Sequence, residues 1–209
     1  MLPFHLILIA ICFFISLFFI KKPTLTDKSM PVFLLLLFAL ESYCYYLKIN
    51  HKGNYVQYNL WFPIEFLYYS FIIILSIRKN PLTKALLIGA CTYLIFVLIN
   101  YLFFQDLHKF SGNSYLLAMV LILLCAFAKM RELINQPEIN NPFYEPFFWL
   151  IIGLITVHLL GIFQFTATDY LYKKHVTVYR ALQKLNLYLT YFQYVCLLVY
   201  FYTKWKLQK

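Results

Sequence analysis

Residues 55–77 read YVQYNLWFPIEFLYYSFIIILSI, and Glu65 is the only charged residue among them. A helix needs roughly 20 apolar residues to cross the hydrocarbon core of a bilayer, which is about 30 Å thick. The segment is long enough for one crossing. A carboxyl group inside a span costs about 3 kcal/mol unless it is paired or hydrated, so such residues mark functional sites. The segment therefore predicts a membrane-spanning helix that carries a candidate functional residue.

Six other apolar runs flank this segment, and together they predict an all-α transmembrane bundle of seven helices. The predicted spans are residues 3–20, 31–47, 55–77, 82–104, 115–128, 146–165 and 181–202. The fifth run is short and the third contains Pro63, so a bundle of six spans is the alternative. Pro31 suits the first turn of the second helix. Pro63 either kinks the third helix or marks its true start.

The composition also places the chain in the membrane class. Of its 209 residues, 63% are hydrophobic and 12% are charged, unlike a soluble domain. The net charge of +10 comes from Lys and Arg scattered between the apolar runs. This pattern is typical of juxtamembrane anchors, and we expect no nucleic-acid partner. The five cysteines show no Cys-x-x-Cys spacing, so we expect neither a disulfide framework nor a metal site.

The connections between the runs are short, which predicts a single transmembrane domain over residues 1–209. Residues 1–77 and 82–165 could form three-helix units, followed by a final helix at 181–202. Any chemistry is then expected inside the bundle or at its ends, in contact with membrane lipids. A signalling output would need a separate membrane or cytoplasmic partner protein.

The basic residues predict the orientation of the chain. No Lys or Arg precedes the first run, and Lys21 and Lys22 follow it, as in an uncleaved anchor with its N-terminus outside. In that orientation 11 of the 18 Lys and Arg residues lie inside and 7 outside. Cytoplasmic loops carry the excess of positive charge, so the C-terminus is expected inside. The segment before the last helix breaks the pattern. In a bacterium the membrane would be the cytoplasmic one.

Three ionisable side chains, Glu41, Glu65 and His158, lie near the middle of predicted spans. Consecutive spans joined by a short loop pack antiparallel, so Glu41 and Glu65 are expected at similar depth. Two carboxyls sharing such a site would not both ionise, and the one that keeps its proton suits a general acid or a proton relay. The alternative is that protonated Glu side chains join helices through hydrogen bonds. For His158, a functional and a structural role are equally open.

A polar stripe runs along the last predicted span. Its members recur at spacings of three and four residues, which places them on one helical face, and tyrosines flank them. The residues are Gln183, Asn186, Thr190 and Gln193, with Tyr188 and Tyr191 beside them. We expect this face to look into the bundle, where it either lines a ligand cavity or joins helices through hydrogen bonds.

Residues 60–67, LWFPIEFL, resemble the Pro-x-Glu-Glu segment of the membrane-embedded lycopene cyclases of the heterodimeric and fused type. In that family the motif opens the third helix of a three-helix unit. Glu65 matches the first acidic position, whereas Phe66 replaces the second Glu. The resemblance implies an isoprenoid substrate and acid catalysis without a cofactor. In a second unit, Glu145 would take the matching place at the opposite membrane face from Glu65.

Two functions are compatible with these residues. The preferred one is a bundle that binds a hydrophobic or lipid-like ligand, as a sensor acting with a partner. The alternative is a cofactor-independent enzyme that rearranges an isoprenoid lipid. Glu65 would then donate the proton, Glu41 or His158 would tune it, and aromatic faces would stabilise a carbocation. A proton-coupled transporter is a third possibility, but the two halves lack paired broken helices.

Overall fold

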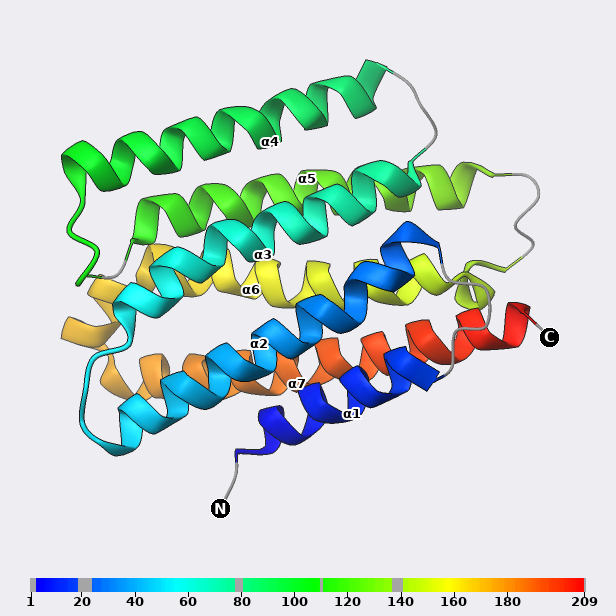
Figure 1. The fold of residues 1–209 in the computed structure, drawn as a ribbon. Coiled ribbons are helices and arrows are strands. Elements are labelled where there is room, and N and C mark those ends of the chain that lie inside the picture. Colours follow the sequence, from blue (N-terminus) through cyan, green and yellow to red (C-terminus); the bar gives the residue numbers. More distant parts are fainter. Residues whose placement is uncertain (1–2, 19–23, 78–80, 110, 137–140, 209) are drawn as a thin grey trace.

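The computed structural model describes residues 3–18, 24–77, 81–109, 111–136 and 141–208, which form an all-helical bundle without strands (Figure 1). A π-helical turn at Asn100–Phe104 extends α4, and a 3-10 turn at Pro142–Tyr144 precedes α6. The helices are α1 (Phe4–Phe18), α2 (Leu25–Ile49), α3 (Tyr55–Ser76), α4 (Pro81–Ile99), α5 (Gly112–Asn135), α6 (Pro146–Lys174) and α7 (Val176–Leu207). The predicted all-α class is thus confirmed for the described residues.

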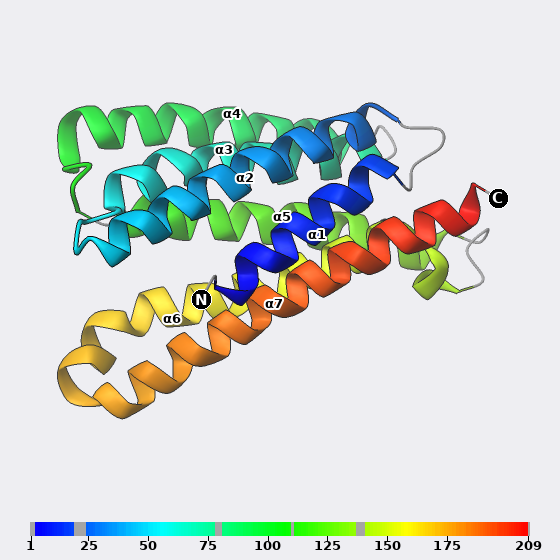
Figure 2. The same ribbon diagram turned by 60° about the horizontal axis from the view of Figure 1, so that its bottom comes forward.

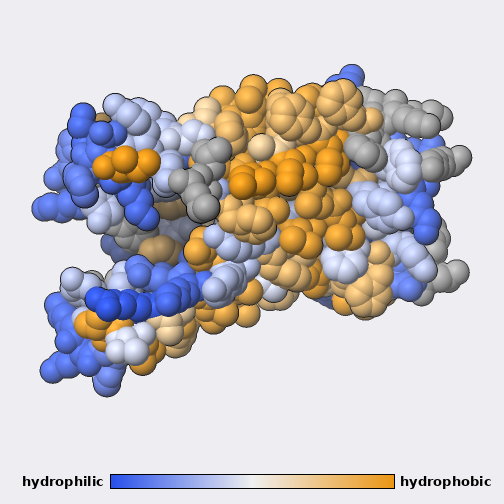
Figure 3. Space-filling model, turned by 90° about the horizontal axis from the view of Figure 1, so that it is seen from below, coloured by the Kyte–Doolittle hydropathy of each residue, from blue (hydrophilic) through white to orange (hydrophobic). Residues whose placement is uncertain are grey.

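Within the described residues, four stretches of helix are long and apolar enough to cross a membrane. They are Leu25–Ile49, Tyr55–Ser76, Pro81–Phe104 and Pro146–Ala167. Helix α1 is apolar but shorter, with 15 residues. Figure 3 shows an apolar band around the middle of the molecule, between hydrophilic ends. This distribution is typical of a bundle with a lipid-facing waist.

Helix α2 begins well before Pro31, so the prediction that this proline lies in the first turn is wrong. Thr24 caps the helix: its side chain accepts a bond from the Asp27 backbone N–H, and the Asp27 carboxylate accepts one from the Thr24 N–H at 2.7 Å. These reciprocal bonds form a capping box. Because of this cap, the helix begins several residues before the apolar run. Pro31 therefore lies in the helix interior.

Pro63 also lies inside a helix, because α3 begins at Tyr55. Proline has no N–H, so it leaves the carbonyl four residues earlier without its helical partner. That carbonyl belongs to Asn59, and the Tyr101 hydroxyl donates to it at 2.7 Å. The Asn59 side chain is fully buried and donates to the carbonyls of Leu107 and Lys109 at 2.8 and 2.7 Å. The hydrogen bond that Pro63 removes is thus replaced by the one from Tyr101. The bonds of the Asn59 side chain hold the loop after α4 against α3.

Connections between the helices alternate between the two ends of the bundle (Figure 1). The end formed by the α2–α3, α4–α5 and α6–α7 connections is called the hairpin end, and the opposite one the C-terminal end. Helix α7 packs along α6 and α1, whereas α3 packs on α5 and α4. At the hairpin end the α6–α7 pair diverges from the other helices (Figure 2).

Buried charges join the helices at the C-terminal end. Asp27, at the start of α2, accepts bonds from Lys204 and from the Tyr200 hydroxyl of α7, the latter at 3.2 Å. The Asp27 side chain is fully buried, and that of Lys204 is 15% exposed. Lys129 of α5 donates to the Ser76 carbonyl at the end of α3, at 2.6 Å. The buried ammonium groups of both lysines therefore have hydrogen-bond acceptors, which offset their loss of hydration.

Candidate functional site

A cavity of about 210 Å³ lies between α2, α3, α5, α6 and α7. Glu41 and Glu65 line it from α2 and α3. Asn186, Thr190 and Gln193 line it from α7. The structure thus brings Glu41 and Glu65 together with three of the four residues of the predicted polar stripe.

Glu41 lies between this cavity and a second one of about 220 Å³, which Lys48 and Cys44 also line. The Tyr58 hydroxyl donates to Glu41 Oε2 at 3.1 Å. Helix α1 brings His5 to the same oxygen, with Nε2 at 3.5 Å. Helices α1 and α3 run beside α2, so their side chains can reach Glu41 from both sides.

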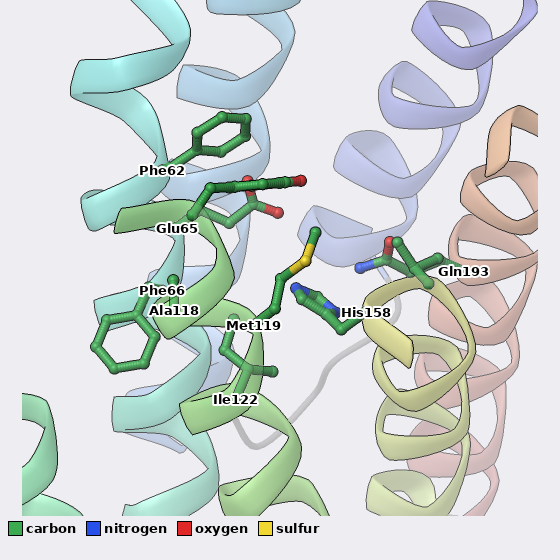
Figure 4. A pocket seen from close by; sticks show the side chains of 10 residues that line it. Phe62, Glu65, Phe66, Ala118, Met119, Ile122, His158 and Gln193 are labelled. Carbon is green, nitrogen blue, oxygen red and sulfur yellow. The ribbon is translucent and has the colours of Figure 1, made fainter. Parts of the chain in front are cut away.

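Glu65 also lines a smaller pocket of about 40 Å³, together with His158 of α6 and Met119 of α5. Figure 4 shows Glu65, Met119, His158 and Gln193 around this pocket, with the Met119 side chain between Glu65 and His158. His158 Nδ1 lies 2.8 Å from the Leu154 carbonyl. A carbonyl only accepts, so Nδ1 carries the proton, and Nε2 of the neutral ring is left as an acceptor.

Aromatic rings form much of the remaining lining of the central cavity. They belong to Tyr58, Phe62, Tyr69, Tyr115 and Tyr194. The rings of Phe62 and Tyr115 are 3.8 Å apart between centroids. These α3 and α5 aromatics are not among the site residues predicted from the sequence. A signal for them exists, because residues 58, 62, 65 and 69 recur at helical spacing and so share one face of α3.

The fourth stripe residue, Gln183, and the two flanking tyrosines lie outside this lining. Gln183 is exposed on the diverging part of the α6–α7 pair, where its amide donates to the Tyr179 hydroxyl at 2.7 Å. Tyr188 is 63% exposed, because a position two residues after Asn186 falls on the opposite side of a helix. Tyr191 packs edge-on against Phe4 of α1, with centroids 5.1 Å apart.

No protein-family model, curated protein or solved structure matches the chain. The resemblance of residues 60–67 to the lycopene cyclases therefore stays a prediction. In this structure Pro63 is inside α3 rather than at its start, and Glu145 caps the start of α6, away from the cavity lining.

The chemistry of the site is that of carboxyl groups, which can accept or donate a proton, beside other hydrogen-bonding groups. Within the described residues, no group of three or more His, Cys, Asp and Glu side chains is placed to hold a metal ion. The site instead combines two carboxylates, amide and hydroxyl groups, and aromatic faces. Such a lining can bind a ligand that has both a polar group and an apolar part.

Proposed function

We propose that the chain is a multi-pass membrane protein that binds an amphipathic, lipid-like ligand in the central cavity. The supporting observation is the lining, where two carboxylates and three polar α7 side chains face aromatic rings. The volume of about 210 Å³ is below the roughly 300 Å³ at which ligand pockets usually begin. The cavity is thus suited to the polar end of a ligand whose tail lies elsewhere.

The diverging helices offer a route for that tail. Figure 3 shows the surface hollowed at the hairpin end, between the α6–α7 pair and the other helices. Asn186 and Thr190 line the cavity from α7, and Glu41 and Tyr58 line it from the other side. A ligand tail can leave the cavity between these two parts of the bundle. A partner protein would then receive any signal that binding produces.

Mass spectrometry of organic extracts tests this proposal. The full chain is purified in mild detergent as wild type, Glu65→Gln and the control Asp106→Asn, which removes an exposed carboxylate outside the cavity. We expect one amphiphile at stoichiometric amount in the wild type and the control, and its loss in Glu65→Gln. Bulk phospholipid alone in all three samples, with no added amphiphile raising the melting temperature, would reject the proposal.

We further propose that α1 to α7 all cross the membrane, with the N-terminus outside and the C-terminus inside. Helices α5 and α7 run beside the four apolar stretches over most of their length, which supports this count (Figure 1). Single cysteines in a cysteine-free background test it with an impermeant maleimide on intact cells. Gly53→Cys at the hairpin end is expected to react, and Asn135→Cys at the C-terminal end only after lysis. The reverse pattern would invert the topology.

A second candidate function is acid catalysis on an isoprenoid lipid, in line with the resemblance to lycopene cyclases. It is favoured by one observation: Glu65, Phe62 and His158 line the same small pocket. A proton donor beside aromatic faces suits a reaction through a carbocation. Conversion of an extracted isoprenoid by the wild type but not by a folded Glu65→Gln variant would favour the enzyme over the binding protein. Full turnover by that variant would exclude it.

A further inference from the structure

We propose that the head group of the ligand is a protonated primary amine, held between Glu41 and Glu65. The inference rests on the binding function proposed above and names the class of ligand. It is carried by three features of the central cavity: its charge, its hydrogen-bonding groups and its aromatic rings.

The charge of the cavity is opposite to that of the chain. The chain has 18 Lys and Arg residues against 8 Asp and Glu residues. Among the described residues, the cavity is lined by two carboxylates and by no Lys or Arg. Lys48 lines the neighbouring cavity instead, and Glu65 has no ion-pair partner in the described part of the chain. A cation between the two carboxylates would relieve their repulsion and their loss of solvation.

The hydrogen-bonding groups of the lining include an acceptor that lacks a donor among the described residues. The Asn186 Oδ1 atom is buried and has no hydrogen-bond partner among the described residues. Carboxylates of Glu41 and Glu65 only accept when ionised. A primary ammonium group brings three N–H donors and no acceptor, which complements such a set.

The aromatic rings favour the same head group. Tyr58, Phe62, Tyr69, Tyr115 and Tyr194 line the cavity that the carboxylates line. A cation within about 6 Å of a ring centroid is attracted by the negative face of the ring. An alcohol head would lack this attraction, and a carboxylate head would be repelled by both Glu side chains. Rings and carboxylates together thus select for positive charge.

Three probes with the same twelve-carbon chain test the inference: dodecylamine, dodecanol and dodecanoate. Each is titrated against the full chain in nanodiscs of zwitterionic lipid, and the apparent Kd is taken from the rise in melting temperature. We expect dodecylamine to bind about tenfold more tightly than dodecanol, and dodecanoate to give no rise. In Glu41→Gln/Glu65→Gln, dodecylamine should lose this advantage while dodecanol binds as before. Asp106→Asn should leave all three values unchanged.

The outcomes separate the two proposals. Equal binding of dodecanol and dodecylamine by the wild type would overturn the amine head group and leave the binding function standing. An amine preference that persists in the double variant would also overturn it, since the charge would then be read elsewhere. No effect of any probe would reject the binding function as well. If the double variant does not fold, the comparison of the three probes in the wild type decides by itself.

Discussion

Gly153 of α6 lies where α7 leaves little room for a Cβ atom. A Cβ atom at this position would be 3.1 Å from Cys196 Cβ and 3.3 Å from Gln193 Cα. The second contact is with backbone, which cannot move without shifting α7. Close helix approach at small residues is a common means of association in membranes. Gly153 therefore helps set the distance between α6 and the polar face of α7.

We expect Gly153→Ala to lower the free energy of unfolding by about 1–3 kcal/mol, because the extra methyl group overpacks this contact. Thermal unfolding in detergent measures the change. Gly89→Ala is the matched control, since its nearest neighbour would be a Leu121 side-chain atom at 3.6 Å, an ordinary contact. Equal melting temperatures for the two variants would contradict the assigned role of Gly153.

Asn59 gives a second prediction at this scale. Besides its two donated bonds, its Oδ1 atom accepts from the Ser111 N–H at 3.1 Å. Asn59→Ala would leave buried loop groups without partners, at a cost of about 2 kcal/mol. Hydrogen exchange should then become faster in residues 105–111. Asn54→Ala serves as the control, because the Asn54 side chain makes no capping bond at the start of α3. Unchanged exchange in the Asn59 variant would refute this account.

Single residues of the site could be predicted only in part. The shared depth of Glu41 and Glu65 follows from two helices and one short connection, and both line one cavity. The tyrosines of α3 did not stand out, because the chain contains 19 tyrosines and hydropathy does not separate a cavity-lining ring from an interfacial one. Only the packing of the neighbouring helices distinguishes them.

At the scale of helices, Asp27 and Lys204 link the start of α2 to the end of α7. Lys204→Met leaves a buried carboxylate uncompensated, so we expect a loss of about 3–5 kcal/mol of stability. Adding Asp27→Asn should restore part of it, and a double-mutant cycle of thermal unfolding measures the coupling. Lys206→Met is the control, because this lysine is exposed and its ammonium group lies over the Tyr144 ring, 5.6 Å from the centroid. Additive losses in the cycle would show that the pair is not coupled.

Helix positions were easier to predict than helix ends. Each predicted span coincides with a helix, but α2, α5, α6 and α7 are longer than their apolar runs. Apolar periodicity reports where a helix is buried, whereas its ends depend on caps and propensity. The capping box of Thr24 and Asp27 is visible in the sequence and predicts the early start of α2. No comparable signal announces the extension of α6 to Lys174.

At the scale of the whole molecule, the α6–α7 pair extends beyond the bundle at the hairpin end (Figure 2). Residues 171–185 are mostly exposed, and they include Lys173, Lys174, Arg180 and Lys184. We expect trypsin added to the outside of intact cells to cut first in this segment. Peptide mapping identifies the site, and a variant with these four residues changed to Gln should resist. First cleavage elsewhere would contradict the exposure of the pair.

The arrangement of the helices could not be derived from the sequence. Hydropathy gives spans and their order, but the cavity exists because α7 packs on α6 and α1 while α3 packs on α5 and α4. Which helix lies beside which depends on small residues such as Gly153 and on buried pairs such as Asp27 and Lys204. These contacts join residues far apart in the chain, and one sequence does not reveal their partners.

The polar face of α7 also bears on how the chain is inserted during synthesis. Helix α7 is not among the stretches that are apolar enough to cross a membrane unaided. Only His175 separates α7 from α6. The first 22 residues of α6 are apolar enough to cross a membrane. A polar helix enters lipid more readily when its polar groups are already paired with a neighbour. The two helices are therefore expected to leave the translocon as one unit. Helix α6 would then enter the lipid only after α7 has been translated.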